Sequence, residues 1–158
     1  MNLIQSLNKP KWRNMREQIV SGFYISDDKK DINLLYVHKY LSEECYWSIG
    51  RNLDIVNRSI ENSLCFGIYT KEAKQIAFAR VVTDYSTFAW VCDVFVDKEF
   101  QGKDLSKNLI KYIIKYPALQ GLKRLLLATK DAHILYKKYG EFSLLTNPEM
   151  WMERNTLS

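Results

Sequence analysis

The sequence predicts an α+β fold built around one mixed sheet, mostly antiparallel, with about four helices. Three apolar runs rich in β-branched and aromatic residues, at 63–70, 75–83 and 88–96, are joined by short polar stretches. Such short connections are typical of an antiparallel meander. A helical pattern at 104–116 is then followed by a buried run at 122–129. A strand reached by a crossover through a helix usually lies parallel to the strand before it, so we expect one parallel pair.

Further elements are expected on both sides of this central part. A first strand is predicted at 17–25, and apolar residues at helical spacing predict helices at 31–44 and 51–62. A last helix is predicted at 131–140, and the tail 142–153 is expected to form a final strand or pair of strands.

Four of these helix boundaries have a residue that favours a helix start or end. Asp31 is a suitable N-cap for the first helix. Pro117 is expected to end the helix at 104–116, because proline lacks the amide that a helix needs. Asp131 and Gly140 are expected to cap the last helix at its two ends.

The length of 158 residues suits one domain, since a chain of this size can bury about 70% of its unfolded surface around a single core. We expect that domain to span 15–158, after an N-terminal arm at 1–14; Met15 is an alternative start that the sequence leaves open. The net charge of +5 would attract a nucleotide, another acidic ligand or nucleic acid without choosing among them.

Several classes of protein are disfavoured. No apolar run approaches the roughly 20 residues needed to span a bilayer, so no membrane partner is expected. The three cysteines, Cys45, Cys65 and Cys92, are widely spaced, and the chain shows no secretory leader, which favours reduced thiols and a cytoplasmic location. With two histidines and no Cys or His pair at ligand spacing, we expect no metal. Basic residues are interleaved with acids, which argues against nucleic acid.

The common catalytic and nucleotide-binding motifs are absent from the sequence. It contains no G-x-S-x-G, no G-x-x-x-x-G-K-[ST] and no G-x-G-x-x-G. The pair Gly102 and Lys103 lacks both the upstream glycine and the following hydroxyl of a phosphate-binding P-loop. The sequence therefore lacks the motifs that usually indicate a hydrolase, an NTPase or a dinucleotide-binding protein.

One turn at the start of a predicted helix suits an anion. In FQGKDLSKNL, Gly102 lets the backbone approach a ligand closely, and helix N-terminal amides favour negative charge. Lys103 and Lys107 could place ammonium groups nearby, and the Ser106 hydroxyl can donate a hydrogen bond. Asp104 has the wrong sign; as an N-cap its carboxylate would bond helix amides that a phosphate needs, and so weaken binding.

Three segments in order carry a resemblance to a known family: DVFV at 93–96, EFQGKDLSKNLI at 99–110 and DAHILYKKYG at 131–140. With the strands before them, the chain resembles the GNAT superfamily of acetyl-CoA-dependent N-acetyltransferases over roughly 17–153. The family's pyrophosphate motif, Q/R-x-x-G-x-G/A, falls on Gln101, Gly102, Lys103, Asp104, Leu105 and Ser106. The chain departs from the family where Asp104 and Ser106 replace glycine-class residues and where Glu141 separates the helix-ending glycine from phenylalanine.

The resemblance implies a set of coenzyme-binding residues. The backbone of the strand Val94, Phe95 and Val96 would pair with the pantetheine arm of acetyl-CoA, although these residues also suit a plain core strand. The pyrophosphate would lie on Gln101, Gly102, Lys103, Asp104, Leu105, Ser106 and Lys107.

The resemblance also implies catalytic residues. Tyr136 matches the tyrosine that often protonates the leaving thiolate in the family; alternatively it belongs to an apolar helix stripe and only packs. Asp93 could bind the substrate ammonium or accept its proton, or could make a structural hydrogen bond. The acceptor pocket would be walled by Tyr40, Tyr46, Trp47 and Arg51, for each of which core packing is the alternative.

Together these features predict an enzyme that transfers acetyl from acetyl-CoA directly to a primary amine of a small molecule or peptide. A second hypothesis is a non-catalytic acyl-CoA-binding module. In this case the replacement of glycine-class residues by Asp104 and Ser106 would be a sign that catalysis has been lost. A third is a nucleic-acid or protein interaction domain without a cofactor. Members of the family often pair, so a homodimer is left open.

Overall fold

The computed structural model describes residues 16–155, and its centre is one six-stranded sheet in which the strands follow in chain order. The strands are β1 (Arg16–Val20), β2 (Phe23–Ser26), β3 (Leu64–Thr70), β4 (Gln75–Thr83), β5 (Phe88–Val96) and β6 (Arg124–Leu127). Neighbouring strands are antiparallel except β5 and β6, which are parallel. The predicted mixed sheet with one parallel crossover is therefore confirmed.

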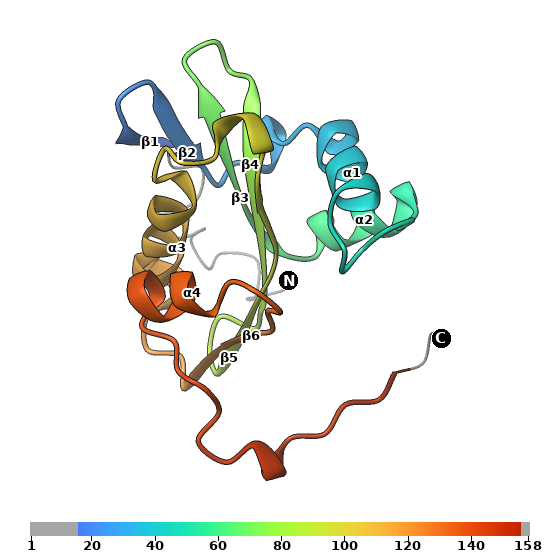
Figure 1. Cartoon of the computed structure of the whole chain (residues 1–158), viewed down its shortest axis with the longest axis vertical. Coiled ribbons are helices and arrows are strands. Elements are labelled where there is room, and N and C mark those ends of the chain that lie inside the picture. The colour runs from blue at the N-terminus through green and yellow to red at the C-terminus, as the bar shows by residue number, and fades with distance from the viewer. Residues whose placement is uncertain (1–15, 156–158) are drawn as a thin grey trace, which may run out of the picture.

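Four α-helices flank this sheet (Figure 1). They are α1 (Leu34–Glu43), α2 (Leu53–Glu61), α3 (Leu105–Lys115) and α4 (His133–Gly140). Short 3-10 turns lie at Lys29–Asp31, Lys98–Phe100, Pro117–Leu119 and Pro148–Met150. Helices α1 and α2 lie on one side of the sheet and α3, with α4 beside it, on the other (Figure 1). The sheet is therefore covered on both faces.

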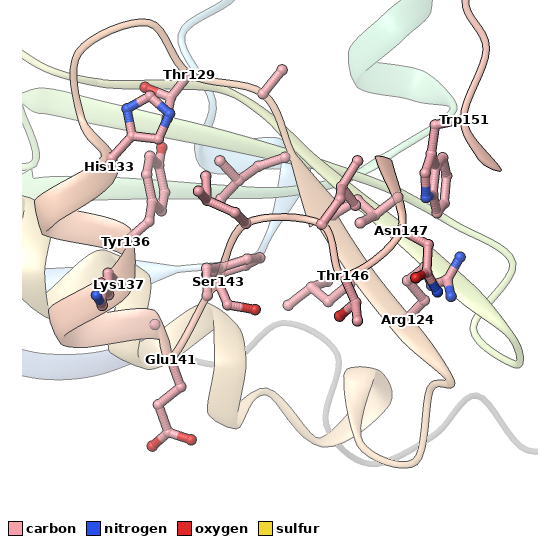
Figure 2. Close-up of a pocket in the computed structure, with 18 of the residues that line it drawn as sticks. Arg124, Thr129, His133, Tyr136, Lys137, Glu141, Ser143, Thr146, Asn147 and Trp151 are labelled. Atoms are coloured by element: carbon pink, nitrogen blue, oxygen red, sulfur yellow. The ribbon is translucent and has the colours of Figure 1, made fainter. Parts of the chain in front are cut away.

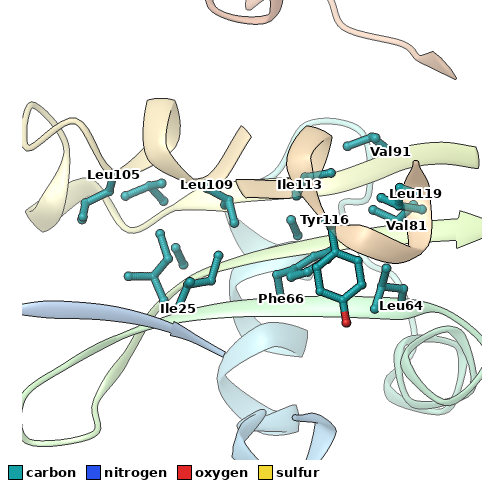
Figure 3. Close-up of a cluster of buried hydrophobic side chains, with 14 of the residues drawn as sticks. Ile25, Leu64, Phe66, Val81, Val91, Leu105, Leu109, Ile113, Tyr116 and Leu119 are labelled. Carbon is teal, nitrogen blue, oxygen red and sulfur yellow. The ribbon is translucent and has the colours of Figure 1, made fainter. Parts of the chain in front are cut away.

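The larger core lies between α3 and the sheet (Figure 3). Leu105, Leu109 and Ile113 recur every four residues along α3, so they share one helix face, and all three are buried. Tyr116 follows them, with its ring edge-on to Phe66 and its hydroxyl donating to a buried carboxylate, that of Asp27. Truncation of any of these leucines to alanine should cost about 2–5 kcal/mol of stability.

A second core lies between the sheet and the pair α1 and α2. It contains Val37, Leu41, Cys45, Val56, Ile60, Cys65, Phe78 and Phe95. Because α1 and α2 each bury two residues spaced four apart, this contact fixes the position of the connection between them, residues 44–52. That connection forms part of the candidate site.

The N-terminal region differs from the prediction of one strand at 17–25. Strands β1 and β2 form an antiparallel hairpin, and Gly22 adopts a φ of 87° in the turn between them. Glycine reaches this left-handed backbone without a Cβ clash, so the chain reverses there. The predicted arm at 1–14 and the alternative start at Met15 lie outside the described residues.

The cap of the first helix is also corrected. Asn33, not Asp31, is the N-cap of α1, and its side chain accepts a hydrogen bond from the Tyr36 amide. Asp31 lies earlier, in a 3-10 turn, where it pairs with Arg16 and accepts from Ser26. Its carboxylate therefore ties the turn to β1 and β2. The predicted end of the third helix at Pro117 is confirmed.

The last helix begins and ends differently from the prediction. It starts after Ala132 without a side-chain cap, so Asp131 does not cap it. Glu141, with a left-handed φ of 57°, is the C-cap, and Gly140 is the last helical residue. A Cβ on Gly140 would lie 2.9 Å from Ile110 of α3, so the glycine serves close packing between the two helices.

The predicted final strand or pair of strands at 142–153 is wrong for the described residues. After Phe142 the chain contains only the 3-10 turn at Pro148–Met150 and runs away from the sheet (Figure 1). Strand formation needs a partner edge as well as a suitable sequence, and this segment has no partner within its own described chain.

Residues 16–155 contain neither a membrane-spanning helix nor a cluster of metal-ligand side chains. No helix between residues 16 and 155 is both long and apolar enough to cross a bilayer. In the same part of the chain, no three His, Cys, Asp or Glu side chains are grouped as metal ligands.

Candidate active site

Strand β5 continues past the end of its parallel neighbour β6, which is paired with it along all of Arg124–Leu127. Their parallel pairing runs from Phe88 opposite Arg124 to Val91 opposite Leu127 and ends there. Beyond Val91, β5 continues to Val96 without a partner residue in β6. The gap opens at the carboxyl ends of two neighbouring strands, a position where open sheets commonly bind ligands.

A bulge in β5 lies just after its last pair with β6. Opposite β4, Cys92 pairs with Arg80 and Phe95 pairs with Phe78, so β5 has one residue more than β4 over this interval. Asp93, inside the interval, has a left-handed φ of 50°, which aspartate tolerates better than most residues. A bulge bends its strand and sharpens the twist, so β5 bends just after its last pair with β6, at Val91.

A cavity of about 400 Å³ lies at this gap. Its walls come from β5, the end of β6, the start of α4 and the connection between α1 and α2. It is lined by Tyr46, Trp47, Arg51, Arg80, Trp90, Val91, Cys92, Asp93, Val94, Ala128, Thr129, Asp131, Ala132 and Tyr136. The cavity therefore brings together Asp93, Tyr136 and three of the four predicted acceptor residues.

Asp93 is the centre of a buried charge cluster. One carboxylate oxygen accepts from Arg51 Nη1 and Arg80 Nε, each at 2.8 Å, and the other accepts from Trp47 Nε1 at 3.3 Å. Burial raises the pKa of Asp93, but the two arginines outweigh it and hold that pKa below its usual value. Asp93 is thus an anion whose oxygens are occupied, a weak base that positions Arg51 and Trp47.

Tyr136 points into the cavity from α4 and is almost fully buried. Its ring packs edge-on to Phe142, with 5.8 Å between centroids. Burial raises its pKa to about 12, with smaller contributions from Tyr46, Asp131 and Cys92. The hydroxyl therefore keeps its proton at neutral pH.

Two positive φ angles shape the loop before α3. Gly102 has a φ of 77° and Asp104, the N-cap of α3, a φ of 58°. The Asp104 side chain does not cap the helix; it is 67% exposed and lies 3.2 Å from Lys107 Nζ. Our expectation that this carboxylate bonds helix amides was therefore wrong, and they are not blocked by it.

Basic side chains gather beside this loop, between α3 and α4. The ammonium groups of Lys107, Lys111 and Lys138 lie 5.3–5.6 Å from the centre of the Tyr139 ring. A ring face stabilises cations, so it can hold three like charges close together. The surface next to the α3 N-terminus is accordingly suited to an anion.

Three of the predicted acceptor residues lie together, and the fourth lies apart. Tyr46 and Trp47 pack edge to face, with 5.0 Å between centroids, and line the cavity with Arg51. Tyr40 does not line it; its ring stacks on Phe95 at 4.1 Å and its hydroxyl donates to the Val96 carbonyl. Tyr40 therefore packs against the second core, which was the alternative interpretation.

The prediction from sequence missed Arg80 and Cys92. Arg80 is the single charged residue in the apolar run QIAFARVVT, and a lone charge in a buried strand is itself a sign that a partner lies near. The Cys92 side chain also lines the cavity, and burial raises its pKa to about 11, so it remains a neutral thiol.

Comparison with known proteins agrees with this architecture. A family model described as an acetyltransferase (GNAT) domain matches residues 61–140. A crystal structure from Xanthomonas campestris pv. campestris, of a protein assigned to the GNAT family of acetyltransferases, is 42% identical. It superposes with a TM-score of 0.81, covering 85% of this chain and 93% of the other.

Two further relatives are more distant. A Gibberella zeae protein assigned as an acetyltransferase is 26% identical over 140 residues, covering 75% of this chain and 78% of the relative. Spermidine N-acetyltransferase from Vibrio cholerae, solved in complex with CoA and spermine, is 19% identical with a TM-score of 0.57, covering 77% of this chain and 81% of the other. The second of these shows the shared fold alone. From the family match and the Xanthomonas structure together, this chain belongs to the GNAT family of acetyltransferases.

Proposed function

We propose that the protein transfers the acetyl group of acetyl-CoA to a primary amine of a small molecule or peptide by direct attack. Acetyl transfer follows from membership of the family. The primary amine as acceptor is the part that we propose. The main support for this proposal is the gap beside β5 beyond the end of β6. The start of α3, which has no side-chain cap, and Tyr136, which is buried and protonated, are the groups that we expect to act there.

The coenzyme would be held by backbone on both sides of this gap. The amides of residues 102–107, in the loop and first turn of α3, would donate to the pyrophosphate, and Lys103 and Lys107 would add positive charge. The Gln101 amide already donates to the Lys98 carbonyl. Residues 94–96 of β5 lie beyond the last pair with β6, so their backbone can pair with the pantetheine arm. The thioester would then lie beyond the end of β6, beside the part of β5 that β6 does not pair.

Tyr136 would act on the leaving group. As the amine nitrogen bonds to the carbonyl carbon, the carbon–sulfur bond breaks and Tyr136 gives its proton to the sulfur. The proton that the amine loses passes to solvent, from which Tyr136 regains one. Asp93 takes no proton in this scheme; it keeps Arg51 and Trp47 in place.

The acceptor would bind between Tyr46, Trp47 and Arg51. Two aromatic rings at right angles offer apolar walls and π faces that attract an ammonium group, while Arg51 carries the positive charge at one side. The distant Vibrio cholerae enzyme is named a spermidine N-acetyltransferase and was solved with CoA and spermine, an amine. A cytoplasmic location, the absence of a metal and the single domain at 15–158 remain predictions.

Coenzyme binding and turnover together test the proposal. At a concentration about 100 times its Kd, acetyl-CoA should raise Tm by about 5–10 °C for a chain of this size. Thiol release from acetyl-CoA should then appear with at least one member of a panel of primary amines. A Tm shift without thiol release from any amine would favour the non-catalytic acyl-CoA-binding module, and no Tm shift would remove both.

Replacement of Asp104 by glycine should tighten acetyl-CoA. Glycine removes an exposed negative charge from the phosphate site and accepts the left-handed φ of residue 104 without strain. We expect Kd, measured by isothermal titration calorimetry, to fall severalfold.

Asp104→Asn is the matched control for this change, because asparagine removes the charge and tolerates the same backbone. If charge is the cause, both variants bind more tightly. Weaker binding by both folded variants would show that the Asp104 carboxylate organises the loop through Lys107.

A further inference from the structure

The cavity of about 400 Å³ at β5 contains more buried positive charge than buried negative charge. Among the described residues, the charged side chains that line it are Arg51, Arg80, Asp93 and Asp131. Asp131 is exposed, so water and salt screen its charge. The Asp93 side chain is 2% exposed and faces both arginines, whose side chains are 21% and 15% exposed. One largely buried positive charge is therefore left without a buried anion.

Arg51 is the arginine with unused donor groups. A guanidinium group has five N–H donors. Arg80 uses Nε on Asp93 and Nη1 on Ser63 Oγ, at 2.8 and 3.1 Å. Arg51 uses Nη1 on Asp93, and no other hydrogen bond of its side chain is found within residues 16–155. Because Arg51 lines the cavity, the rest of its planar fork can bind a ligand that enters there.

A carboxylate fits this excess charge better than a phosphate group. The fork of an arginine binds a carboxylate through two parallel hydrogen bonds. A carboxylate carries one negative charge, whereas a phosphate monoester carries about 1.5 to 2 at neutral pH. A bound carboxylate would thus leave the buried part of the cavity neutral, and a phosphate would reverse the sign of its charge.

The walls of the cavity near Arg51 suit an apolar side chain. The rings of Tyr46 and Trp47 lie edge to face, with 5.0 Å between centroids, and Trp90 and Val94 also line the cavity. The Tyr46 hydroxyl accepts a hydrogen bond from the Lys130 amide at 3.1 Å. This bond ties the connection between α1 and α2 to the loop after β6, so the Tyr46 ring is held in place as a wall.

The expected position of the thioester is close to Arg51. Arg51 is bonded to Asp93, and the thioester is expected beside residues 92–96 of β5. Tyr136, the proposed acid, lines the same cavity, and its side chain extends from α4 towards Thr129 (Figure 2). A carboxylate bound to Arg51 and an amine that attacks the thioester must therefore be neighbouring groups of one molecule.

We propose that the acceptor is an amino acid with an apolar side chain, and that its carboxylate binds Arg51. The inference rests on the proposed function for the amine and adds a site for the acid group. The carboxylate accepts two hydrogen bonds from the guanidinium, the apolar side chain lies against Tyr46 and Trp47, and the amino group faces the thioester. Arg51 therefore determines the specificity of the enzyme for its acceptor.

Isothermal titration calorimetry of the full chain, with and without CoA, tests the carboxylate site. The ligands are phenylalanine, leucine and tyrosine, each paired with the amine that lacks its carboxylate: 2-phenylethylamine, 3-methylbutylamine and tyramine. At least one amino acid should bind at least about tenfold more tightly than its paired amine, because the amine cannot form the charged hydrogen bonds to Arg51. Equal affinity in all three pairs, or no binding of any amino acid, would overturn the proposal.

Replacement of Arg51 by glutamine should abolish this preference. The Kd of the amino acid should rise at least about tenfold, while the Kd of its paired amine should change little. Arg58→Gln is the matched control, because Arg58 is exposed on α2 and lines neither this cavity nor the larger one beside β6. If Arg51→Gln does not fold by circular dichroism, Arg51→Lys takes its place; it keeps the charge without the fork and should lower the preference severalfold. A preference that persists in the folded Arg51 variant would contradict the assignment.

Thiol release from acetyl-CoA separates this inference from the proposed function. The amino acid that binds should be acetylated with a higher kcat/KM than its paired amine. If amines without a carboxylate are acetylated equally well, the carboxylate site is wrong and acetyl transfer to amines stands. If amino acids bind with the expected preference and no thiol is released, the proposed acetyl transfer is wrong and the carboxylate site stands.

Discussion

Replacement of Tyr136 by phenylalanine is expected to lower kcat for acetyl transfer at least about tenfold, because a general acid typically contributes roughly 100-fold or more. The ring and its contact with Phe142 remain, so the variant should fold normally. Only the hydroxyl that would protonate the leaving thiolate is removed. The KM for acetyl-CoA should change little, because the proposed coenzyme contacts lie on β5 and at the start of α3.

Steady-state thiol release measures this effect, with Tyr24→Phe as the control. Tyr24 lies on β2 and stacks on Tyr69, in another part of the sheet, so loss of its hydroxyl should leave kcat unchanged. An unchanged kcat in Tyr136→Phe would remove the acid role and leave packing as the function of that residue.

The pH dependence of the wild-type enzyme should follow the acceptor amine and not Tyr136. The pKa of Tyr136 is raised to about 12, so its proton is present throughout the neutral and mildly alkaline range. The amine attacks only when neutral, and kcat/KM should therefore rise with pH towards the amine pKa. A fall in rate between pH 7 and about 9 would contradict a proton donor with so high a pKa.

Replacement of Asp93 by asparagine should destabilise the fold strongly. The variant leaves Arg51 and Arg80 near a neutral amide in a place where the original carboxylate is only 2% exposed. Removal of one partner from a buried ion pair costs about 3–5 kcal/mol, because the remaining charge is left without compensation. We expect a loss of this size in the free energy of unfolding measured with urea at pH 7.

The matched control is Asp104→Asn, in an exposed ion pair with Lys107. Exposed pairs contribute about 1 kcal/mol or less, so this variant should remain close to the wild type. A loss for Asp93→Asn no greater than for Asp104→Asn would show that the charge cluster does not stabilise the fold.

The same cluster should make stability depend on pH. The pKa of Asp93 is depressed in the folded protein, so its contribution is present above the unfolded value of about 3.9. That contribution is lost as the pH falls through the folded pKa. The difference in unfolding free energy between wild type and Asp93→Asn should consequently shrink between pH 5 and about 3.

The sheet could be predicted largely from local pattern. The strands β4 and β5 begin and end where the apolar runs at 75–83 and 88–96 predicted them, because each run is bounded by polar turns. The crossover through α3 to β6 followed from the order of the elements. Gly22 is an instance where a turn signal was present and was not used, so one strand was predicted in place of the hairpin.

The centre of the site could be predicted only in part. Tyr136 and Asp93 were identified through the family resemblance, whereas the bulge at Asp93 depends on how many residues β4 and β5 each place between two pairs. The cluster of Arg51, Arg80 and Asp93 joins three separate parts of the chain, and no local pattern shows such a contact. The tail at 142–153 has a strand-like sequence, but within residues 16–155 it pairs with no strand of the sheet.

The central claim is that acetyl-CoA binds at the gap beside β5 with its thioester next to Tyr136. A crystal structure of the protein with acetyl-CoA tests this claim most directly. We predict that the pyrophosphate lies on the amides of residues 102–107 and the pantetheine arm along residues 94–96. The carbonyl carbon should lie beyond the end of β6, beside residues 92–96 of β5, with the sulfur within hydrogen-bonding reach of the Tyr136 hydroxyl. Acetyl-CoA bound elsewhere, or a gap filled by side chains while the coenzyme lies outside it, would contradict the account.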